Sequence, residues 1–124
     1  MLKIIFDTNF LIDLFRFKIL LDEIEEIFNE KVEFFTLNKV LEELKRMSQS
    51  KGKKGNYAKL ALILLKEKNV KILDMRNKNT DDALINFAKK NYVIATNDKE
   101  LRKKLKELNF KIIYLRGKKK IMMG

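Results

Sequence analysis

The sequence predicts an α/β fold, because short apolar runs typical of buried strands alternate with amphipathic segments typical of helices. Two further observations support this fold: hairpin signals are lacking, and no internal repeat or domain boundary interrupts the 124 residues. Strands that are separated by helices pair in parallel, with helices on both faces of the sheet. We therefore expect a three-layer α/β/α sandwich with a central five-stranded parallel sheet. Residues 1–124 would form a single domain, with a basic C-terminal tail at about 116–124.

The first half of the chain is expected to contribute two strands and three helices. Residues 2–6 are apolar and β-rich, and residues 32–36 show the same pattern. Apolar side chains at helical spacing predict helices over 10–15 and 20–28, the second with an acidic outer face. Asn38 can cap a third helix, whose inner face carries Val40, Leu41, Leu44 and Met47.

The second half begins with a stretch, residues 48–56, whose small, glycine and cationic residues predict a mobile surface loop. Residues 57–68 follow as a helix that is apolar over more than one face, so we expect a homodimer contact there. Thr80 can cap the next helix, and Asn97 the last one. The remaining strands are expected at 70–73, 92–95 and 110–115.

The composition excludes several chemistries. Without Cys, the chain has no disulfide, thiol nucleophile or thiolate zinc site, and without His it has no Ser-His-Asp triad or imidazole base. An enzyme with this sequence must use carboxylates, Lys, Tyr, Ser or Thr, or a metal held by oxygen ligands. No apolar run approaches the ~20 residues that cross a bilayer, and a signal-peptide pattern is absent. We therefore expect a cytoplasmic protein that does not contact membranes.

Charge is distributed unevenly along the chain. Residues 1–50 hold 7 Lys or Arg and 10 Asp or Glu, a net of −3, whereas residues 51–124 hold 21 and 7, a net of +14. The total of +11 indicates a polyanionic partner, most simply nucleic acid. The alternative explanation is a lysine-rich solvated surface.

Carboxylates follow four of the predicted strands. Because ligands bind at the carboxyl edge of parallel sheets, residues just after the strands, or early in the next helix, are expected to meet there. These residues are Asp7 after the first strand, Glu42 and Glu43 after the second, Asp81 and Asp82 after the third, and Asp98 after the fourth.

Clustered carboxylates repel one another, and this repulsion raises their pKa values. A hard divalent cation relieves the conflict, because Mg²⁺ or Mn²⁺ takes oxygen ligands and keeps several waters. Such an ion can lower the pKa of a bound water and offset charge on a phosphoryl group. Phosphodiester hydrolysis requires these properties and needs neither His nor Cys.

Each acidic position also has a structural explanation. Asp81 and Asp82 lie in the first turn of a helix, where the macrodipole favours acids. Asn97 and Glu100 can form a capping box around Asp98. Similar explanations apply to Thr8 as a helix cap, to Asp13 on an outer helix face, and to one of Glu42 and Glu43 as solvated surface. The case for a metal site therefore depends on the convergence of four positions.

The four acidic segments resemble the motifs of the PIN-domain nucleases. Asp7-Thr8-Asn9 after an apolar strand resembles the opening motif of this family, and 41–44 resembles the second, with Glu43 as the acid. Residues 81–85 are similar to the third motif, in which the spacing to the following apolar pair selects Asp82. Residues 95–101 resemble the fourth, with Asp98 as the acid. The resemblance spans essentially the whole chain.

The resemblance implies cleavage of RNA by an enzyme that holds one or two Mg²⁺ or Mn²⁺ ions, often as a homodimer. The catalytic and metal-binding residues would be Asp7, Glu43, Asp82 and Asp98, supported by Thr8, Asn9, Asp81, Thr96 and Asn97. Phosphates would be bound by Lys51, Lys53, Lys54, Arg102, Lys103, Lys118 and Lys119. Tyr57 could stack on a base, whereas core packing is the better explanation for Phe10.

Two branches of the family are consistent with these motifs. One is the VapC-type toxin, an RNase that is neutralised by an antitoxin, and the other acts in rRNA processing within a ribosomal-precursor assembly. The segments 96–105 and 113–116 look more like archaeal relatives of the processing branch. Two rival functions remain: a non-catalytic RNA-binding component of a ribonucleoprotein, and a DNA-directed flap or 5′ nuclease.

Overall fold

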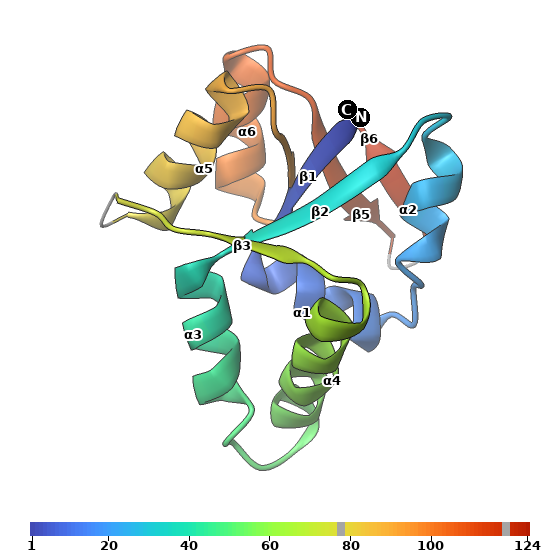
Figure 1. The fold of residues 1–124 in the computed structure, drawn as a ribbon, viewed down its shortest axis with the longest axis vertical. Coiled ribbons are helices and arrows are strands. Elements are labelled where there is room, and N and C mark those ends of the chain that lie inside the picture. The colour runs from blue at the N-terminus through green and yellow to red at the C-terminus, as the bar shows by residue number, and fades with distance from the viewer. Residues whose placement is uncertain (77–78, 118–119) are drawn as a thin grey trace.

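The computed structural model describes residues 1–76, 79–117 and 120–124. It has an α/β architecture in which a six-stranded sheet carries helices on both faces (Figure 1). The elements are β1 (Leu2–Phe6), α1 (Thr8–Arg16), α2 (Asp22–Ile27), β2 (Val32–Leu37), α3 (Asn38–Met47), α4 (Lys53–Glu67), β3 (Lys71–Leu73), α5 (Thr80–Lys89), β4 (Val93–Ala95), α6 (Lys99–Glu107), β5 (Ile112–Arg116) and β6 (Lys120–Met123).

The strand order is β3-β2-β1-β4-β5-β6, with β1 near the centre. The first five strands pair in parallel, as predicted. From β1 the chain builds the sheet outward through β2 and β3, and it then returns to the other side of β1 for β4 and β5. This reversal makes the carboxyl ends of β1 and β4 a topological switch point, where parallel sheets bind ligands.

The prediction of five strands was wrong, because residues 120–123 of the expected basic tail form a sixth strand. β6 pairs antiparallel with β5, with Leu115 opposite Ile121 and Tyr114 opposite Met122. Gly117 lies before β6 with φ +59°, a conformation that L side chains rarely adopt. The high charge of the segment concealed a short strand, and a single glycine is a weak hairpin signal.

The predicted phosphate-binding residues Lys118 and Lys119 lie outside the described residues.

The core is centred on β1. Ile4, Ile5 and Phe6 are fully buried, as expected for a central parallel strand that is covered on both faces. The Phe6 ring stacks on Phe10 and Phe34, with centroid separations of 5.7 and 5.2 Å. These contacts fix the end of β1, and hence the position of the residue that follows it.

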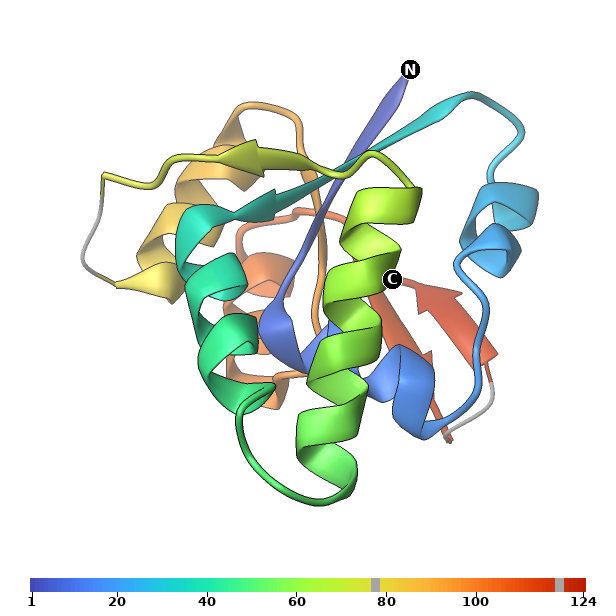
Figure 2. The same ribbon diagram turned by 60° about the horizontal axis from the view of Figure 1, so that its bottom comes forward.

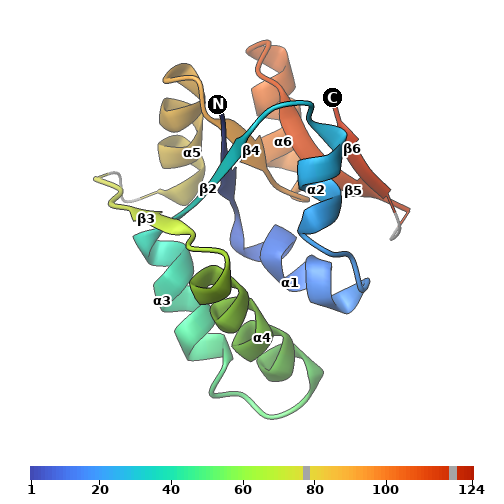
Figure 3. The ribbon, with the colours of Figure 1, turned by 45° about the vertical axis from the view of Figure 1, so that its right-hand side comes forward.

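The helices α3 and α4 form a hairpin that packs against α1, below the sheet in Figure 1 and beside α1 in Figures 2 and 3. The prediction of a loop over 48–56 was too long, because α4 begins at Lys53. Gly55 explains the early start: it is buried, and a Cβ there would overlap the Ser50 carbonyl oxygen. A tight turn therefore replaces most of the expected loop.

The starts of α3 and α5 differ from the predicted helix caps. Asn38 does not precede its helix but begins it, and its Oδ1 accepts a hydrogen bond from the Met75 N–H at 3.1 Å. Asn79, rather than Thr80, caps α5 by accepting from the N–H groups of Asp81 and Asp82 at 2.8 and 3.2 Å.

The outer surface of α4 retains apolar side chains. Leu60 and Ile63 are 44% and 52% exposed. This exposure agrees with a helix that is apolar on more than one face, and the homodimer stays a prediction. Within the described ranges, no helix has both the length and the hydropathy that bilayer crossing requires.

Candidate active site

The candidate site begins at Asp7, where β1 passes into α1. Asp7 caps α1: its Oδ1 accepts a hydrogen bond from the Thr8 N–H at 2.7 Å. Its Oδ2 accepts a second bond from the Thr96 hydroxyl at 2.9 Å. Asp7, and not Thr8, is therefore the helix cap, and both of its carboxylate oxygens are held in fixed directions.

Burial raises the pKa of Asp7 above its ordinary value of 3.8. The hydrogen bonds from Thr96 and Thr8 act in the opposite direction, while the charges of Asp81 and Glu43 raise the pKa further. A half-buried carboxylate that faces other carboxylates is a group whose charge a cation would stabilise.

Asp98 follows β4 at the same edge of the sheet. The backbone N–H of Asp98 donates to the Thr96 hydroxyl at 3.2 Å. Thr96 therefore contacts the backbone of Asp98 as well as the carboxylate of Asp7. The Asp98 Oδ1 caps α6 by accepting from the N–H groups of Glu100 and Leu101 at 2.9 and 3.1 Å. The predicted cap, Asn97, was therefore wrong.

The two threonines of the site are buried, whereas the predicted support Asn9 is exposed. Thr96 is fully buried and Thr8 is 4% exposed. The Thr8 hydroxyl donates to Glu43 Oε2 at 3.3 Å and thereby links α3 to the site. Glu43 is the glutamate that the motif selected, and both Glu42 and Glu43 are exposed, so the hydrogen bond from Thr8 is what links Glu43 to the site.

At the start of α5 the structure favours Asp81 over the predicted Asp82. Burial raises the pKa of Asp81, and the nearby charge of Asp98 raises it further. Asp81 is also the aspartate whose charge acts on Asp7, whereas Asp82 is exposed. The two residues are adjacent on a helix and therefore point in different directions. Asp81 is the one that interacts with Asp7 and Asp98, and the choice of Asp82 as a metal ligand stays a prediction.

Sequence analysis did not find a role for Asp13, which was expected on an outer helix face. Its Oδ2 accepts a hydrogen bond from the Asn97 Nδ2 at 2.8 Å, and Asn97 Oδ1 accepts one from the Leu115 N–H at 2.9 Å. Asn97 thus joins α1 to β5 next to Asp98. The sequence signal that could have indicated a role for Asp13 is its position six residues after Asp7, on the helix that starts at the carboxyl edge of the sheet.

The chemistry of these side chains fits a hard divalent cation. They offer only oxygen ligands, and burial and like charges disfavour ionised Asp7 and Asp81. Across the described residues, however, no group of three or more carboxylates is close enough to hold an ion directly. A hydrated ion that contacts carboxylates through water would not require such a group.

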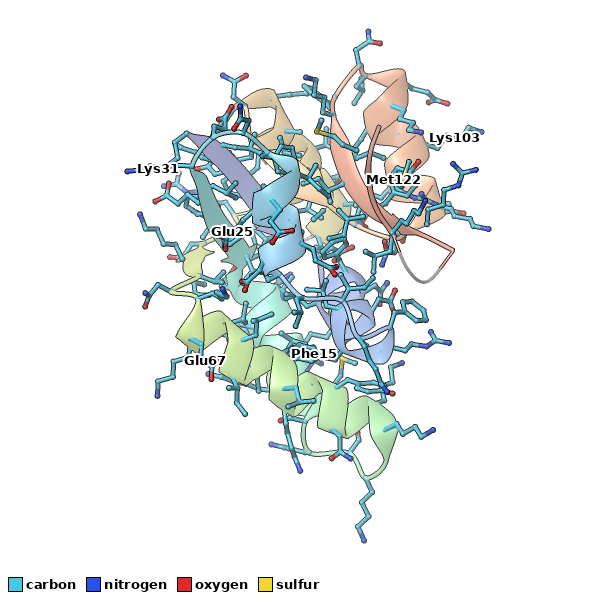
Figure 4. All side chains as sticks on the ribbon, turned by 90° about the vertical axis from the view of Figure 1, so that its right-hand side faces the viewer. Phe15, Glu25, Lys31, Glu67, Lys103 and Met122 are labelled. Atoms are coloured by element: carbon cyan, nitrogen blue, oxygen red, sulfur yellow. The ribbon has the colours of Figure 1, made fainter. Side chains whose placement is uncertain are left out.

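The predicted phosphate-binding residues occupy two regions. Lys51, Lys53 and Lys54 are exposed at the junction between α3 and α4. Lys103 is exposed and projects outward from α6 (Figure 4), whereas the Arg102 guanidinium lies 4.4 Å from the ring centroid of Tyr114. Sequence analysis missed Arg46, which with Glu43, Met47 and Ser50 lines a cavity of about 410 Å³ beside the site.

Comparison with protein families gives a match over residues 4–118, to the family described as "PIN like domain". The chain belongs to the PIN-domain family. It is also 46% identical over 124 residues to Ribonuclease VapC4 of Methanocaldococcus jannaschii, a match that covers 96% of this chain and 94% of that protein. The motif resemblance in the sequence is thereby confirmed.

Two solved structures show the same fold. The PIN domain endonuclease Utp24 superposes with a TM-score of 0.79 at 24% identity, over 98% of this chain and 90% of that one. A domain of a functionally unknown protein from Methanocaldococcus jannaschii has a TM-score of 0.65 at 19% identity, over 94% and 93% of the two chains. These likenesses confirm the α/β PIN architecture.

Proposed function

We propose that this PIN protein is a metal-dependent endoribonuclease that hydrolyses RNA phosphodiester bonds at the carboxyl ends of β1 and β4. The observation that carries the proposal is the buried Thr96 hydroxyl, which donates to the Asp7 carboxylate and accepts from the backbone N–H of Asp98. The identity to Ribonuclease VapC4 over nearly the whole chain supports RNA as the substrate.

One or two Mg²⁺ or Mn²⁺ ions would be held directly or through water by Asp7, Glu43, Asp81 and Asp98. The raised pKa values of Asp7 and Asp81 support this proposal, which gives Asp81 the role that the sequence motif gave to Asp82. A bound divalent cation would supply an acidified water as the nucleophile and would offset charge on the phosphoryl group.

The protein's own groups would orient the reacting groups. Thr8 and Thr96 fix Asp7 and Glu43, in the way that hydrogen bonds around metal ligands usually do. Asn97 and Asp13 anchor the loop that carries Asp98. Arg46 would contact a phosphate of the substrate, since it lies within one turn of Glu43 on α3.

The cationic regions would bind the RNA backbone. Contacts of Lys and Arg with phosphates are sequence-independent and weaken steeply with salt. We assign this role to Lys51, Lys53 and Lys54, to Arg102 and Lys103 on α6, and to Lys118 and Lys119 in the basic segment before β6.

Two cellular roles fit such a ribonuclease. The relation to VapC4 supports a toxin-type RNase with an antitoxin partner, and rRNA processing within a precursor assembly is the second role. In either role the protein would act on RNA in the cytoplasm. A homodimer would use the exposed apolar face of α4, where Leu60 and Ile63 lie.

The test is cleavage of a labelled single-stranded RNA by purified wild-type protein and by Asp7→Asn, with Mn²⁺, with EDTA, and after Mn²⁺ is restored. We expect the wild type to cleave in a reversible, Mn²⁺-dependent manner and Asp7→Asn to be inactive although it folds. The charge-matched control is Asp22→Asn on α2, whose carboxylate pairs with Lys68 away from the site. Undiminished cleavage by Asp7→Asn would overturn the assignment.

The same assay separates the rival functions. Salt-dependent RNA binding that EDTA does not alter, without any cleavage, would identify a non-catalytic RNA-binding component. Faster cleavage of the matched DNA strand than of the RNA would identify a DNA-directed nuclease.

A further inference from the structure

A second cavity lies between the end of α1 and the start of α4. Its volume is about 470 Å³, and it is lined by Ile12, Arg16, Lys53, Lys54 and Tyr57. The lining includes an aromatic ring, an aliphatic wall and three cationic side chains, and no carboxylate. An aromatic surface beside cations is the combination that binds a base together with its phosphate.

The three residues from α4 share one side of that helix. At 100° per residue, Lys53, Lys54 and Tyr57 fall within about 100° of one another. The Tyr57 ring is half-buried against the core, so its position is fixed, while Lys53 and Lys54 are exposed and can follow a phosphate. The tight turn at Gly55 is what brings these lysines over the end of α1.

The cavity is connected to the candidate active site through α1. Arg16 follows Asp7 by nine residues, which is roughly 13 Å along a helix. Asp13 connects the two regions, because it pairs with Arg16 at 3.9 Å and accepts a hydrogen bond from Asn97, next to Asp98. A single RNA strand with its scissile phosphate at Asp7 can therefore reach the cavity within a few nucleotides.

We propose that this cavity is a nucleotide subsite, in which Tyr57 stacks on one base of the RNA and Arg16, Lys53 and Lys54 bind the adjoining phosphates. The proposal rests on the proposed ribonuclease function. It adds that the enzyme recognises a single-stranded segment of several nucleotides, with an unpaired base at a fixed distance from the cleaved bond. Stacking tolerates any base, so the subsite selects strand conformation rather than sequence.

The test measures RNA binding to Asp7→Asn, so that cleavage plays no part. Fluorescence anisotropy is recorded with a short single-stranded RNA and with a series in which one nucleotide at a time is made abasic. We expect one position at which loss of the base weakens binding about tenfold, as removal of a stacked base does. In Asp7→Asn/Tyr57→Leu the same abasic change should have no further effect, and Tyr57→Phe should restore the wild-type pattern.

Lysine variants test the phosphate contacts. Lys53→Ala/Lys54→Ala should weaken binding of every RNA in the series and reduce its salt dependence. The matched control is Lys59→Ala/Lys66→Ala, which removes the same charge from exposed positions on the opposite side of α4 and should retain the salt dependence. Circular dichroism on each variant verifies that the helix content of the protein is unchanged.

The outcomes separate this proposal from the ribonuclease function. The subsite proposal is overturned if no abasic position weakens RNA binding, or if the weakening persists unchanged in Tyr57→Leu. Either result would overturn it even if the wild type cleaves RNA. A Tyr57-dependent abasic position supports the subsite even if no cleavage is found. Tyr57-dependent binding of an acidic peptide, with a flat RNA series, would make the cavity a protein-docking site and overturn the proposal.

Discussion

The hydroxyl of Thr96, a fully buried residue after β4, donates a hydrogen bond at 2.9 Å to the half-buried Asp7 after β1. The same oxygen accepts the Asp98 N–H at 3.2 Å. One side chain therefore fixes the acid that follows the central strand and the acid that follows its neighbour. This relationship makes Thr96 the residue on which the geometry of the proposed metal site depends.

Thr96→Val tests this dependence, because valine keeps the shape and removes the hydroxyl. We expect the rate of RNA cleavage to fall about 10- to 100-fold, as when residues that orient metal ligands are lost. The free energy of unfolding should fall by about 1–3 kcal/mol, since a buried hydrogen-bonding group of Asp7 is left unpaired. In the wild type the hydrogen bond from Thr96 lowers the pKa of Asp7, so its loss should raise that pKa. The acid limb of the activity–pH profile should therefore move to higher pH.

Thr96→Ser is the matched control for this experiment, because it keeps the hydroxyl and removes only a methyl group. It should retain most of the activity and the wild-type acid limb. A Thr96→Val enzyme with an unchanged pH profile would show that Thr96 only fills space in the core.

Asp7→Asn is expected to stabilise the protein in the absence of divalent cations. A carboxyl whose pKa is higher in the folded than in the unfolded chain binds protons more tightly when folded. Its ionisation therefore lowers the free energy of unfolding as the pH rises from its ordinary pKa of 3.8 through the raised value in the folded chain. Asparagine removes this charge and still offers an oxygen to the Thr8 N–H, so the helix cap is retained.

The measurement is thermal unfolding of wild type and Asp7→Asn over a pH series. The two midpoints should be similar in acid, with the variant higher at neutral pH. Added Mg²⁺ or Mn²⁺ should raise the wild-type midpoint and should have less effect on the variant, since a ligand stabilises the state that binds it. A variant that is less stable than the wild type at neutral pH would contradict the burial of an unfavourable charge.

The parts of the fold that sequence analysis predicted correctly have strong periodic signals. β1 is a short apolar run that ends in Asp7, and its full burial follows from that pattern. β6 was missed because its four residues follow a run of lysines and one glycine, so charge concealed the strand. Pairing with β5 determines this strand, and such a tertiary contact leaves little local signal.

The candidate site also combines residues that have a local sequence signal with residues whose positions depend on tertiary contacts. Asp7, Glu43 and Asp98 could be proposed from the sequence because their motifs place them at strand ends or one turn into a helix. The choice between Asp81 and Asp82 could not be made in this way, since both occupy the first turn of α5 and only the rotation of that helix decides which one faces Asp98. Asp13 was missed because its partner, Asn97, lies 84 residues away in the sequence.

Asp81→Asn and Asp82→Asn form a matched pair, since both remove one negative charge from the same turn of α5. Asp81→Asn should lower the rate of cleavage at least about tenfold and weaken the stabilisation by Mn²⁺. Asp82→Asn should behave as wild type within about twofold, as expected for an exposed carboxylate. The reverse order of activities would restore the assignment that the sequence motif made.

Gly55→Ala tests whether the tight turn between α3 and α4 positions the basic residues. The added Cβ would overlap the Ser50 carbonyl oxygen, and a backbone atom cannot move aside as a flexible side chain can. We expect the free energy of unfolding to fall by about 2 kcal/mol or more, within the range caused by overpacking. RNA binding should weaken as well, because Lys53 and Lys54 lie in the first turn of the displaced helix.

The neighbouring variant Asn56→Ala is the control, because Asn56 is exposed in the same turn of α4 and alanine favours a helix. Chemical denaturation should place it within about 0.5 kcal/mol of the wild type. If Gly55→Ala were equally harmless, the turn would have room to relax, and the position of Lys53 and Lys54 over α1 would not depend on Gly55. If Gly55→Ala lost stability but kept full RNA affinity, these lysines would reach the phosphates without the tight turn.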